Sequence, residues 1–226
     1  MFRDRIDAGR QLGQRVAMRL QERAGDDQAA GRAVAPLVLG LPRGGVVVAA
    51  EVARALGRAA PLDVFVVRKI GAPWQPELAL GAVADVDGRA EAVLNRETIE
   101  ALGVDDVYLQ RAIADEHAEA LRRLRVFRGE RSAPKIEGRD VIVVDDGIAT
   151  GATVRAALQV LRRQKPRRLI LAVPVAPAEA LEELRGEVET IVCLASPAFF
   201  SSVGRYYEDF EQTSDEEVIA LLAGHD

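Results

Sequence analysis

The hydrophobic positions along the chain alternate between short, unbroken apolar runs and longer stretches with helical spacing. The apolar runs are rich in Val, Leu and Ile, which is typical of strands that are buried on both faces of a sheet. They cover residues 37–40, 62–67, 141–144, 169–175 and 190–195. Between them, apolar residues recur every three or four positions, as in the stretch 154–164. This alternation predicts an α/β fold with a doubly wound parallel sheet, covered by helices on both faces.

Further helices are predicted outside this alternation. The patterns that indicate them lie at residues 4–23, 96–128, 178–184 and 215–222. The first is expected to end before Gly25, and residues 28–35 indicate a loose connector. The second is broken near Gly103, and we interpret it as a helical insertion in the α/β core.

The alternation predicts a single domain over residues 1–226. We expect its core at residues 36–196 and a small N- and C-terminal hood built from residues 1–35 and 197–226. Within the core, Asp87-Gly88 separates two apolar segments, which favours a tight hairpin turn. We expect this hairpin to lead the chain back into the parallel sheet.

Composition narrows the class of protein. Of the 226 residues, 49% are hydrophobic and 29% are charged, which is ordinary for a globular chain. The formal net charge of −5 gives no electrostatic case for binding nucleic acid. Cys193 is the only cysteine, so no internal disulfide can form and a reducing compartment fits. Without a signal-peptide core or a run of transmembrane length, we expect a cytoplasmic protein with no membrane partner.

The most informative segment is Val141–Thr153. Its apolar strand ends at Asp145 and Asp146, which we call the acid pair, and the Thr150 loop (residues 147–153) then opens a helix. Free backbone N–H groups and the helix dipole favour an anion at such a helix start, and glycines let a phosphate approach the backbone. Carboxylates beside a phosphate are explicable if they bind sugar hydroxyls, or a Mg²⁺ ion that the ligand brings. A plain strand–turn–helix connection with acidic caps is the alternative.

Two more strands end in candidate loops. The strand 37–40 ends at the Arg43 loop (residues 42–45, Pro-Arg-Gly-Gly), which also opens a helix and predicts a second anion site, although a simple turn is the alternative. The run 62–67 ends at Arg68 and Lys69, followed by a stretch with two prolines, a glycine and a tryptophan. This composition indicates a functional loop, with a solvated basic turn as the alternative. All three loops are expected at the carboxyl edge of the sheet.

Aromatic residues concentrate near the end of the chain, between Phe199 and Tyr207. They can form a stacking wall for a planar base, or they can pack against the N-terminal helix. Packing is favoured, because aromatic clusters are more often part of a core.

The segment Val141–Thr153 resembles the phosphoribosyl-pyrophosphate (PRPP) motif of type I phosphoribosyltransferases: a hydrophobic strand, two acidic residues and a Thr-Gly-x-Thr loop. The resemblance implies the fold of that family. It also implies an enzyme that transfers the 5-phosphoribosyl group of PRPP to a nucleobase or related nitrogen heterocycle, with release of pyrophosphate. The acid pair would hold the ribose 2- and 3-hydroxyls. The residues that would wrap the 5-phosphate are Ala149, Thr150, Gly151, Ala152 and Thr153.

The same resemblance implies roles for the other two segments. The loop that corresponds to the Arg43 loop binds pyrophosphate in the family and often carries a cis peptide before its basic residue. The expected pyrophosphate ligands are therefore Pro42, Arg43, Gly44 and Gly45. The segment Arg68–Pro73 resembles the mobile catalytic loop of adenine phosphoribosyltransferases. The expected catalytic residues are Arg68 and Lys69, which would reach the pyrophosphate, and Glu77, which would act on the base.

The resemblance further implies a cofactor and partners. Mg²⁺ is expected, and Asp145 and Asp146 would hold it indirectly, through ribose hydroxyls or water. PRPP and a small nitrogenous base are the expected ligands. Dimers are common in the family, so a homodimer is one expectation, although the sequence shows no interface signature.

One position departs from the family pattern. Family members that act on 6-oxopurines usually carry an aspartate where this chain has Ala149, and alanine removes that general acid/base. A second hypothesis is therefore a non-catalytic PRPP- or nucleotide-sensing regulator of the same fold. The basic residues Arg43, Arg68 and Lys69 favour the enzyme, because a sensor has no need to grip pyrophosphate. A third hypothesis, another Mg²⁺-dependent enzyme such as a phosphatase, does not explain the Thr150 loop.

Overall fold

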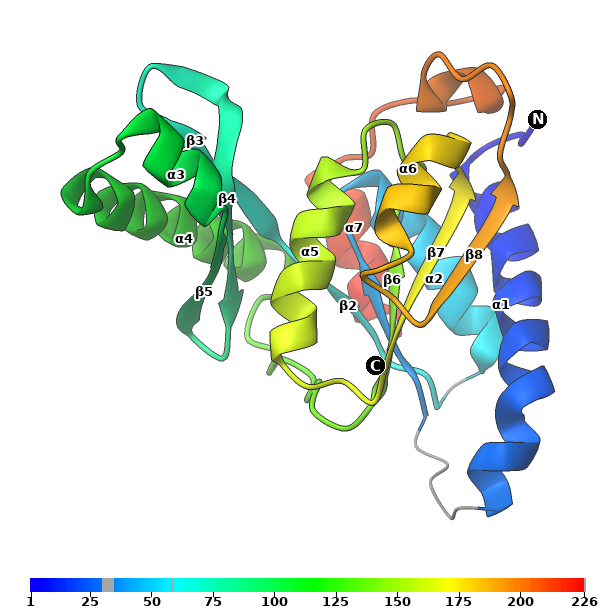
Figure 1. The fold of residues 1–226 in the computed structure, drawn as a ribbon. Helices are drawn as coiled ribbons and strands as arrows, with labels where there is room; N and C mark the ends of the chain where they lie inside the picture. Colours follow the sequence, from blue (N-terminus) through cyan, green and yellow to red (C-terminus); the bar gives the residue numbers. More distant parts are fainter. Residues whose placement is uncertain (30–34, 58, 226) are drawn as a thin grey trace.

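The computed structural model describes residues 1–29, 35–57 and 59–225. Its centre is a five-stranded sheet with the order β2-β1-β6-β7-β8, in which all neighbouring strands are parallel (Figure 1). The strands are β1 (Leu37–Gly40), β2 (Leu62–Val64), β6 (Asp140–Val144), β7 (Arg168–Val175) and β8 (Thr190–Ala195). The doubly wound parallel sheet that the apolar runs predict is confirmed.

Each strand feeds two apolar layers, because successive side chains point to opposite faces of the sheet. In β6, Ile142 and Val144 belong to one layer, and Val141 and Val143 belong to the other. All four side chains are fully buried. Because both faces of such a strand are closed to water, none of its positions needs a polar side chain. This explains the unbroken apolar runs in the sequence.

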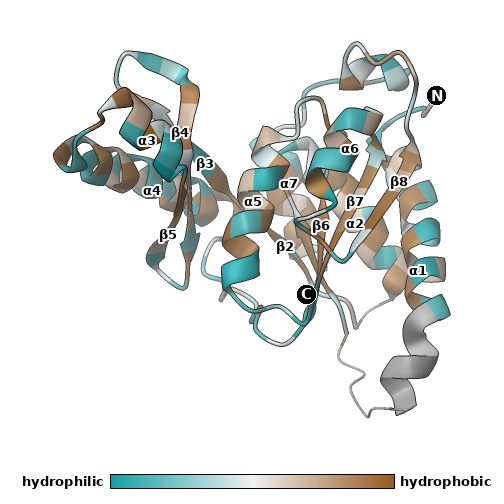
Figure 2. Cartoon of the chain, in the orientation of Figure 1, coloured by the Kyte–Doolittle hydropathy of each residue, from teal (hydrophilic) through white to brown (hydrophobic). Residues whose placement is uncertain are grey.

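Helices close both layers. The layer of Ile142 is covered by α1 (Arg5–Ala29), α2 (Gly44–Leu56) and α7 (Asp215–Ala223). The layer of Val141 is covered by α5 (Ala152–Arg163) and α6 (Ala178–Leu184). Figure 2 shows the hydrophobic strands between helices that turn hydrophilic residues outward. None of the helices in the described part of the chain is both long and apolar enough to cross a membrane.

The first helix is longer than its sequence pattern predicts. The pattern indicates an end at residue 23, but α1 continues through Gly25 to Ala29. A glycine inside a helix costs only about 1 kcal/mol, which is too little to stop a helix that already packs against α2 and the sheet. Most of the connector expected at residues 28–35 lies outside the described residues.

An antiparallel sheet with the order β3-β4-β5 forms the base of a side lobe. The lobe consists of β3 (Val67–Ala72), β4 (Gln75–Val86), β5 (Arg89–Leu94), α3 (Arg96–Leu102) and α4 (Asp106–Arg128). Its own core joins Ile70 and Leu80 of the sheet to Ile99 and Leu109 of the helices. In Figure 1 the lobe stands beside α5, on the opposite side from α1.

Three predictions about the side lobe are wrong. The run 62–67 is not one strand, because Val64 ends β2 and Val67 begins β3. Phe65 and Val66 face different apolar layers, and an unbroken apolar run does not distinguish a strand from such a passage between sheets. The segment 68–77, expected as a loop, forms the β3–β4 hairpin, and its functional role stays a prediction. The hairpin at Asp87-Gly88 exists, but it stays in the side lobe and does not return to the parallel sheet.

The hood joins the two ends of the chain, and we define it as residues 1–4 and 197–212. The amide of Phe2 donates to the carbonyl of Tyr206 at 2.8 Å, and the rings of Phe2 and Tyr207 lie 5.4 Å apart. This agrees with the expected packing role of the aromatic cluster. The hood is smaller than expected, since α1 and α7 bury Leu12 and Val218 in the main core.

A buried ion cluster fixes the start of the strand that leads to the acid pair. Asp140 is only 3% exposed and begins β6. Arg167 donates to its Oδ2 at 2.6 Å, and Arg168 donates to both of its oxygens. Although burial raises the pKa of Asp140, the hydrogen bonds from Arg168 and Arg167 hold it below its usual value. The cluster therefore ties β6 to β7 at the end of the sheet opposite the candidate site.

Candidate active site

The candidate site lies where the two central strands end. Gly40 of β1 pairs with Val144 of β6, and the amide of Leu41 donates to the carbonyl of Val144 at 2.9 Å. From these ends the chain runs to β2 on one side and to β7 on the other, so the strand order reverses between β1 and β6. Ligands of open α/β sheets usually bind outside such a switch point.

The Thr150 loop joins β6 to α5. Ile148 anchors it, because this side chain is buried and its amide donates to the carbonyl of Val175 at 2.9 Å. Gly151 caps α5 with a φ of 75°, in the left-handed region that glycine favours. The exposed residues of the loop are Ala149, Thr150, Ala152 and Thr153. Among the described residues, the amides of Thr153 and Val154 have no hydrogen-bond partner, so the loop can receive a phosphate.

The Arg43 loop opens α2 directly beside the acid pair. Its Pro42–Arg43 peptide is cis, which matches the feature that the family resemblance implies. A Cβ atom on Gly45 would lie 2.9 Å from Cα of Asp145, and one on Gly44 would lie 2.8 Å from Cγ of Asp146. Only glycine fits at these positions. Within the described chain, the amides of Gly44 and Gly45 donate to no partner, so they remain donors for a ligand.

The side chain of Arg43 points away from the sheet toward α7 and the side lobe. Its Nη1 lies 3.6 Å from Oδ1 of Asp215. With Arg122 and Arg123 of α4, both residues line a cavity of about 230 Å³. The two α4 guanidinium groups are paired with Glu119.

The two carboxyl groups of the acid pair have different surroundings. Asp145 accepts a hydrogen bond from the amide of Asp146 at 2.9 Å, and burial together with the Asp146 carboxylate raises the pKa of Asp145 well above its usual value. Asp146 is ion-paired, because Nε of Arg5 donates to its Oδ2 at 2.7 Å. A carboxyl that resists ionisation beside one that is neutralised is typical of ligand sites.

The hood contacts both Asp146 and Arg5. The hydroxyl of Tyr207 donates to the carbonyl of Asp146 at 2.5 Å. Burial and the Asp146 carboxylate raise the pKa of Tyr207 well above its usual value, so this hydroxyl stays a donor at neutral pH. The guanidinium of Arg5 lies 3.8 Å from the centre of the Phe210 ring, and its Nη1 donates to the carbonyl of Glu211 at 2.6 Å.

Sequence reasoning missed Arg5 and Tyr207. They are 141 and 61 positions away from Asp146, and local spacing carries no information about contacts over such distances. The aromatic concentration around Tyr207 gave a partial signal. Arg5 had none, because a single arginine at the start of an amphipathic helix is an ordinary surface residue.

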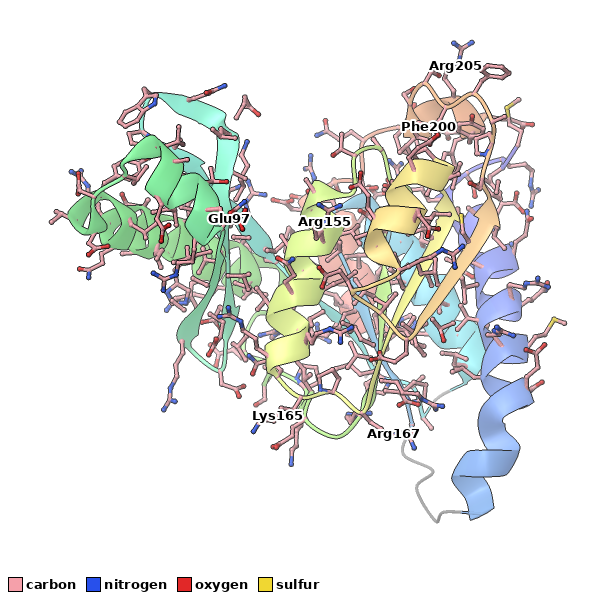
Figure 3. The ribbon with its side chains drawn as sticks, viewed as in Figure 1. Glu97, Arg155, Lys165, Arg167, Phe200 and Arg205 are labelled. Atoms are coloured by element: carbon pink, nitrogen blue, oxygen red, sulfur yellow. The ribbon has the colours of Figure 1, made fainter. Side chains whose placement is uncertain are left out.

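The two basic residues of the β3–β4 hairpin point to opposite faces of its sheet, so that Lys69 faces the Thr150 loop and Arg68 faces α4. Arg68 donates to Glu116 of α4 at 2.8 Å, and Nζ of Lys69 donates to Glu77 at 3.0 Å. Lys69 also lines a cavity of about 460 Å³ between the side lobe and α5, together with Ala152 and Thr153. Arg155, labelled on α5 in Figure 3, lines the same cavity. Over the described residues, the structure records no contact between these hairpin residues and Arg43, and the Glu77 side chain is 93% exposed.

The donor set fits a magnesium ion that is bound mainly by its ligand. The described residues contain no group of three or more His, Cys, Asp or Glu that could hold a metal on its own. Asp145 and Asp146 offer only hard carboxylate oxygens. Mg²⁺ is commonly bound by one or two carboxylates, several waters and substrate phosphates, so two acids beside two loops with free amides match this pattern.

Comparisons with known proteins agree with this geometry. The family model of the phosphoribosyl transferase domain matches residues 3–209, which include the acid pair, both loops, Arg5 and Tyr207. A crystal structure of the protein TT1426 from Thermus thermophilus matches with a TM-score of 0.82 and 43% identity, over 99% of this chain and 98% of that chain.

Two curated relatives come from strains of Mycobacterium tuberculosis, and each is named as a candidate phosphoribosyl transferase. They are 46% identical to this chain over 222 residues, which is 98% of this chain and 46% of each relative. The chain therefore spans about half the length of the curated relatives it matches.

Proposed function

The chain belongs to the phosphoribosyl transferase family, and we propose that it transfers the 5-phosphoribosyl group of PRPP to a nucleobase or related nitrogen heterocycle and releases pyrophosphate. The observation that carries this proposal is the contact between the Arg43 loop and the acid pair, where the backbone of Gly44 packs on the Asp146 carboxylate. PRPP has a phosphate on one side of its ribose and a pyrophosphate on the other. Two anion-binding loops on either side of two carboxylates match that order.

Each part of PRPP has a proposed partner. The Thr150 loop would hold the 5-phosphate with the hydroxyls of Thr150 and Thr153 and the free amides of the first turn of α5. The acid pair would accept hydrogen bonds from the ribose 2- and 3-hydroxyls. The Arg43 loop would hold the pyrophosphate with Arg43 and the amides of Gly44 and Gly45.

In the proposed reaction, the bond between ribose C1 and the pyrophosphate oxygen breaks while a bond between C1 and the heterocycle nitrogen forms. The nitrogen loses its proton, and Glu77 is the proposed acceptor, because it is the carboxylate that Lys69 of the β3–β4 hairpin holds at 3.0 Å. The chain contributes positioning and charge stabilisation: the loops fix both ends of PRPP, and Arg43 stabilises the charge that gathers on the leaving group.

Mg²⁺ is the proposed cofactor, and it would neutralise the pyrophosphate as it leaves. The acid pair would hold the ion through ribose hydroxyls or water. The acceptor itself is proposed only as a nitrogenous base, because the side chains that would recognise one particular base are not assigned.

A second function, a PRPP- or nucleotide-sensing regulator, is favoured by two observations. Ala149 supplies no acid or base at its exposed position in the Thr150 loop. In addition, the ion pair with Arg5 already neutralises the Asp146 carboxylate within the chain. A regulator of this kind would bind PRPP and release no pyrophosphate.

A pyrophosphate-release assay separates the two functions. The chain would be incubated with PRPP, Mg²⁺ and a panel of purine, pyrimidine and pyridine bases, one at a time. Release with at least one base, lost in the double variant Asp145→Asn/Asp146→Asn, is the expected result. Binding of PRPP without release for any base would contradict the enzyme and support the regulator.

A further inference from the structure

We propose that Arg5 is a ligand of the PRPP pyrophosphate group and acts together with the Arg43 loop. The inference rests on the proposed function and adds a residue from α1 to the binding site. The guanidinium of Arg5 lies where the Arg43 loop and the acid pair touch.

Arg5 lies beside the free amides at the start of α2. A Cβ atom on Gly44 would lie 2.7 Å from Nε of Arg5 and 2.8 Å from Cγ of Asp146. The guanidinium is therefore in contact with the first turn of α2, next to the amides of Gly44 and Gly45 that remain free for an anion. We therefore expect a phosphate that binds those amides to come within reach of Arg5.

Arg5 also has more donors than the described chain uses. An arginine has five N–H donors arranged in a planar fork. In Arg5, Nε is used on Asp146 and Nη1 is used on the carbonyl of Glu211. Over the described residues, Nη2 has no hydrogen-bond partner, although the side chain is only 12% exposed. The guanidinium therefore has N–H donors left over, from which a ligand anion can accept hydrogen bonds.

The hood holds the guanidinium in place. The ring of Phe210 lies 3.8 Å from Cζ of Arg5, and Glu211 binds Nη1 from the same side. A surface arginine loses entropy when it adopts one geometry, whereas Arg5 is already fixed by the hood before a ligand arrives. Preorganised guanidinium forks are suited to two-point binding of phosphate groups.

The ion pair with Asp146 explains why Arg5 favours the pyrophosphate over the ribose. Asp146 accepts from Arg5 through Oδ2, and this carboxylate is expected to bind ribose hydroxyls with its remaining lone pairs. Arg5 therefore stands between the ribose-binding carboxylate and the pyrophosphate-binding amides. Its unused donors serve the leaving group and not the hydroxyls.

The test compares three probes by isothermal titration with Mg²⁺: PRPP, inorganic pyrophosphate and ribose 5-phosphate, which lacks the pyrophosphate group. The variants are Arg5→Gln and Arg5→Lys, where lysine retains the charge but lacks the fork. Arg3→Ala is the matched control, because Arg3 lies two positions away with a 70% exposed side chain that pairs only weakly with Asp7. Thermal unfolding establishes that each variant is folded.

The expected result is a loss of about tenfold or more in affinity for PRPP and for pyrophosphate in Arg5→Gln, with a smaller loss in Arg5→Lys. Affinity for ribose 5-phosphate stays close to that of the wild type in both variants, and Arg3→Ala binds all three probes normally. An equal loss for PRPP and ribose 5-phosphate would overturn the proposal, because Arg5 would then only position Asp146. A gain in PRPP affinity would also overturn it, because Arg5 would then compete with the ligand.

The experiment keeps the two proposals apart. If the wild type binds PRPP and Arg5→Gln binds pyrophosphate as tightly as the wild type, the role of Arg5 is wrong and the proposed function stands. If the wild type binds neither PRPP nor ribose 5-phosphate but binds pyrophosphate through Arg5, the proposed function is wrong and the anion site remains. If the wild type does not bind pyrophosphate at all, the role of Arg5 is wrong.

Discussion

The substitution Gly44→Ala tests the contact on which the site depends. An alanine Cβ would overlap Oδ2 of Asp146, its nearest neighbour, and would lie 2.8 Å from Cγ of the same carboxylate, whereas carbon atoms in good contact are about 3.5–4.0 Å apart. The carboxylate or the start of α2 would have to move by roughly 1 Å. Arg5 is crowded as well, because its Nε would be only 2.7 Å from the new methyl group.

A shift of this size has two expected consequences. Overpacking of a closely packed position lowers the free energy of unfolding by about 1–3 kcal/mol. The misplaced carboxylate and amides also weaken the binding of PRPP, and a displacement near 1 Å can cost about a hundredfold in function. We therefore expect Gly44→Ala to remain folded at room temperature and to lose at least about tenfold in PRPP affinity.

Isothermal titration with PRPP and Mg²⁺, combined with urea unfolding, measures both effects. Gly186→Ala is the matched control, because a Cβ at that glycine would meet nothing within 4 Å and its φ is not positive. The control is expected to bind as the wild type does. If Gly44→Ala retained the wild-type affinity, the packing of the Arg43 loop on Asp146 would have no role in binding and the reasoning would be refuted.

Other substitutions separate stability from function. Asp145→Asn is expected to raise the free energy of unfolding at neutral pH while abolishing PRPP binding. Because the pKa of Asp145 is raised in the folded protein, the wild type loses stability as pH rises from the ordinary aspartate range through that raised pKa. Over this range, urea unfolding should show a growing difference in the free energy of unfolding between the variant and the wild type. Asp140→Asn is expected to lower the free energy of unfolding by about 3 kcal/mol, because it removes the buried carboxylate that accepts hydrogen bonds from both Arg167 and Arg168. Because the pKa of Asp140 is lowered, this loss should shrink as the wild type is acidified through that pKa, again measured by urea unfolding. Lys69→Ala is expected to reduce turnover far more than PRPP affinity, and an unchanged rate in the pyrophosphate-release assay would remove Lys69 from the mechanism.

Sequence alone was sufficient for those parts of the fold that are locally encoded. Four of the five apolar runs, the helix after the Thr150 loop and the Asp87-Gly88 turn follow from periodicity and turn chemistry, which involve neighbours along the chain. The acid pair and its loop were found for the same reason, because strand, acids, glycines and helix are consecutive.

The parts that sequence missed depend on long-range packing. The passage at Phe65 and Val66 is as apolar as a strand, because each residue is buried against a different sheet face. The pairing of Arg5 with Asp146 joins the start of α1 to the end of β6, 141 positions apart in the sequence. Neither feature produces a recurring pattern of hydrophobic and polar residues in the sequence. Only the three-dimensional structure therefore reveals that a residue of α1 lies in the candidate site.

The acid pair and the two loops are proposed to form one PRPP site. Isothermal titration of the wild type with PRPP and Mg²⁺, repeated on Asp145→Asn/Asp146→Asn, tests this claim most directly. The account predicts saturable binding to the wild type and a loss of about a hundredfold or more in the double variant, because two acceptors for the ribose hydroxyls are changed at once. Equal binding by both proteins, or no binding by the wild type, would contradict it.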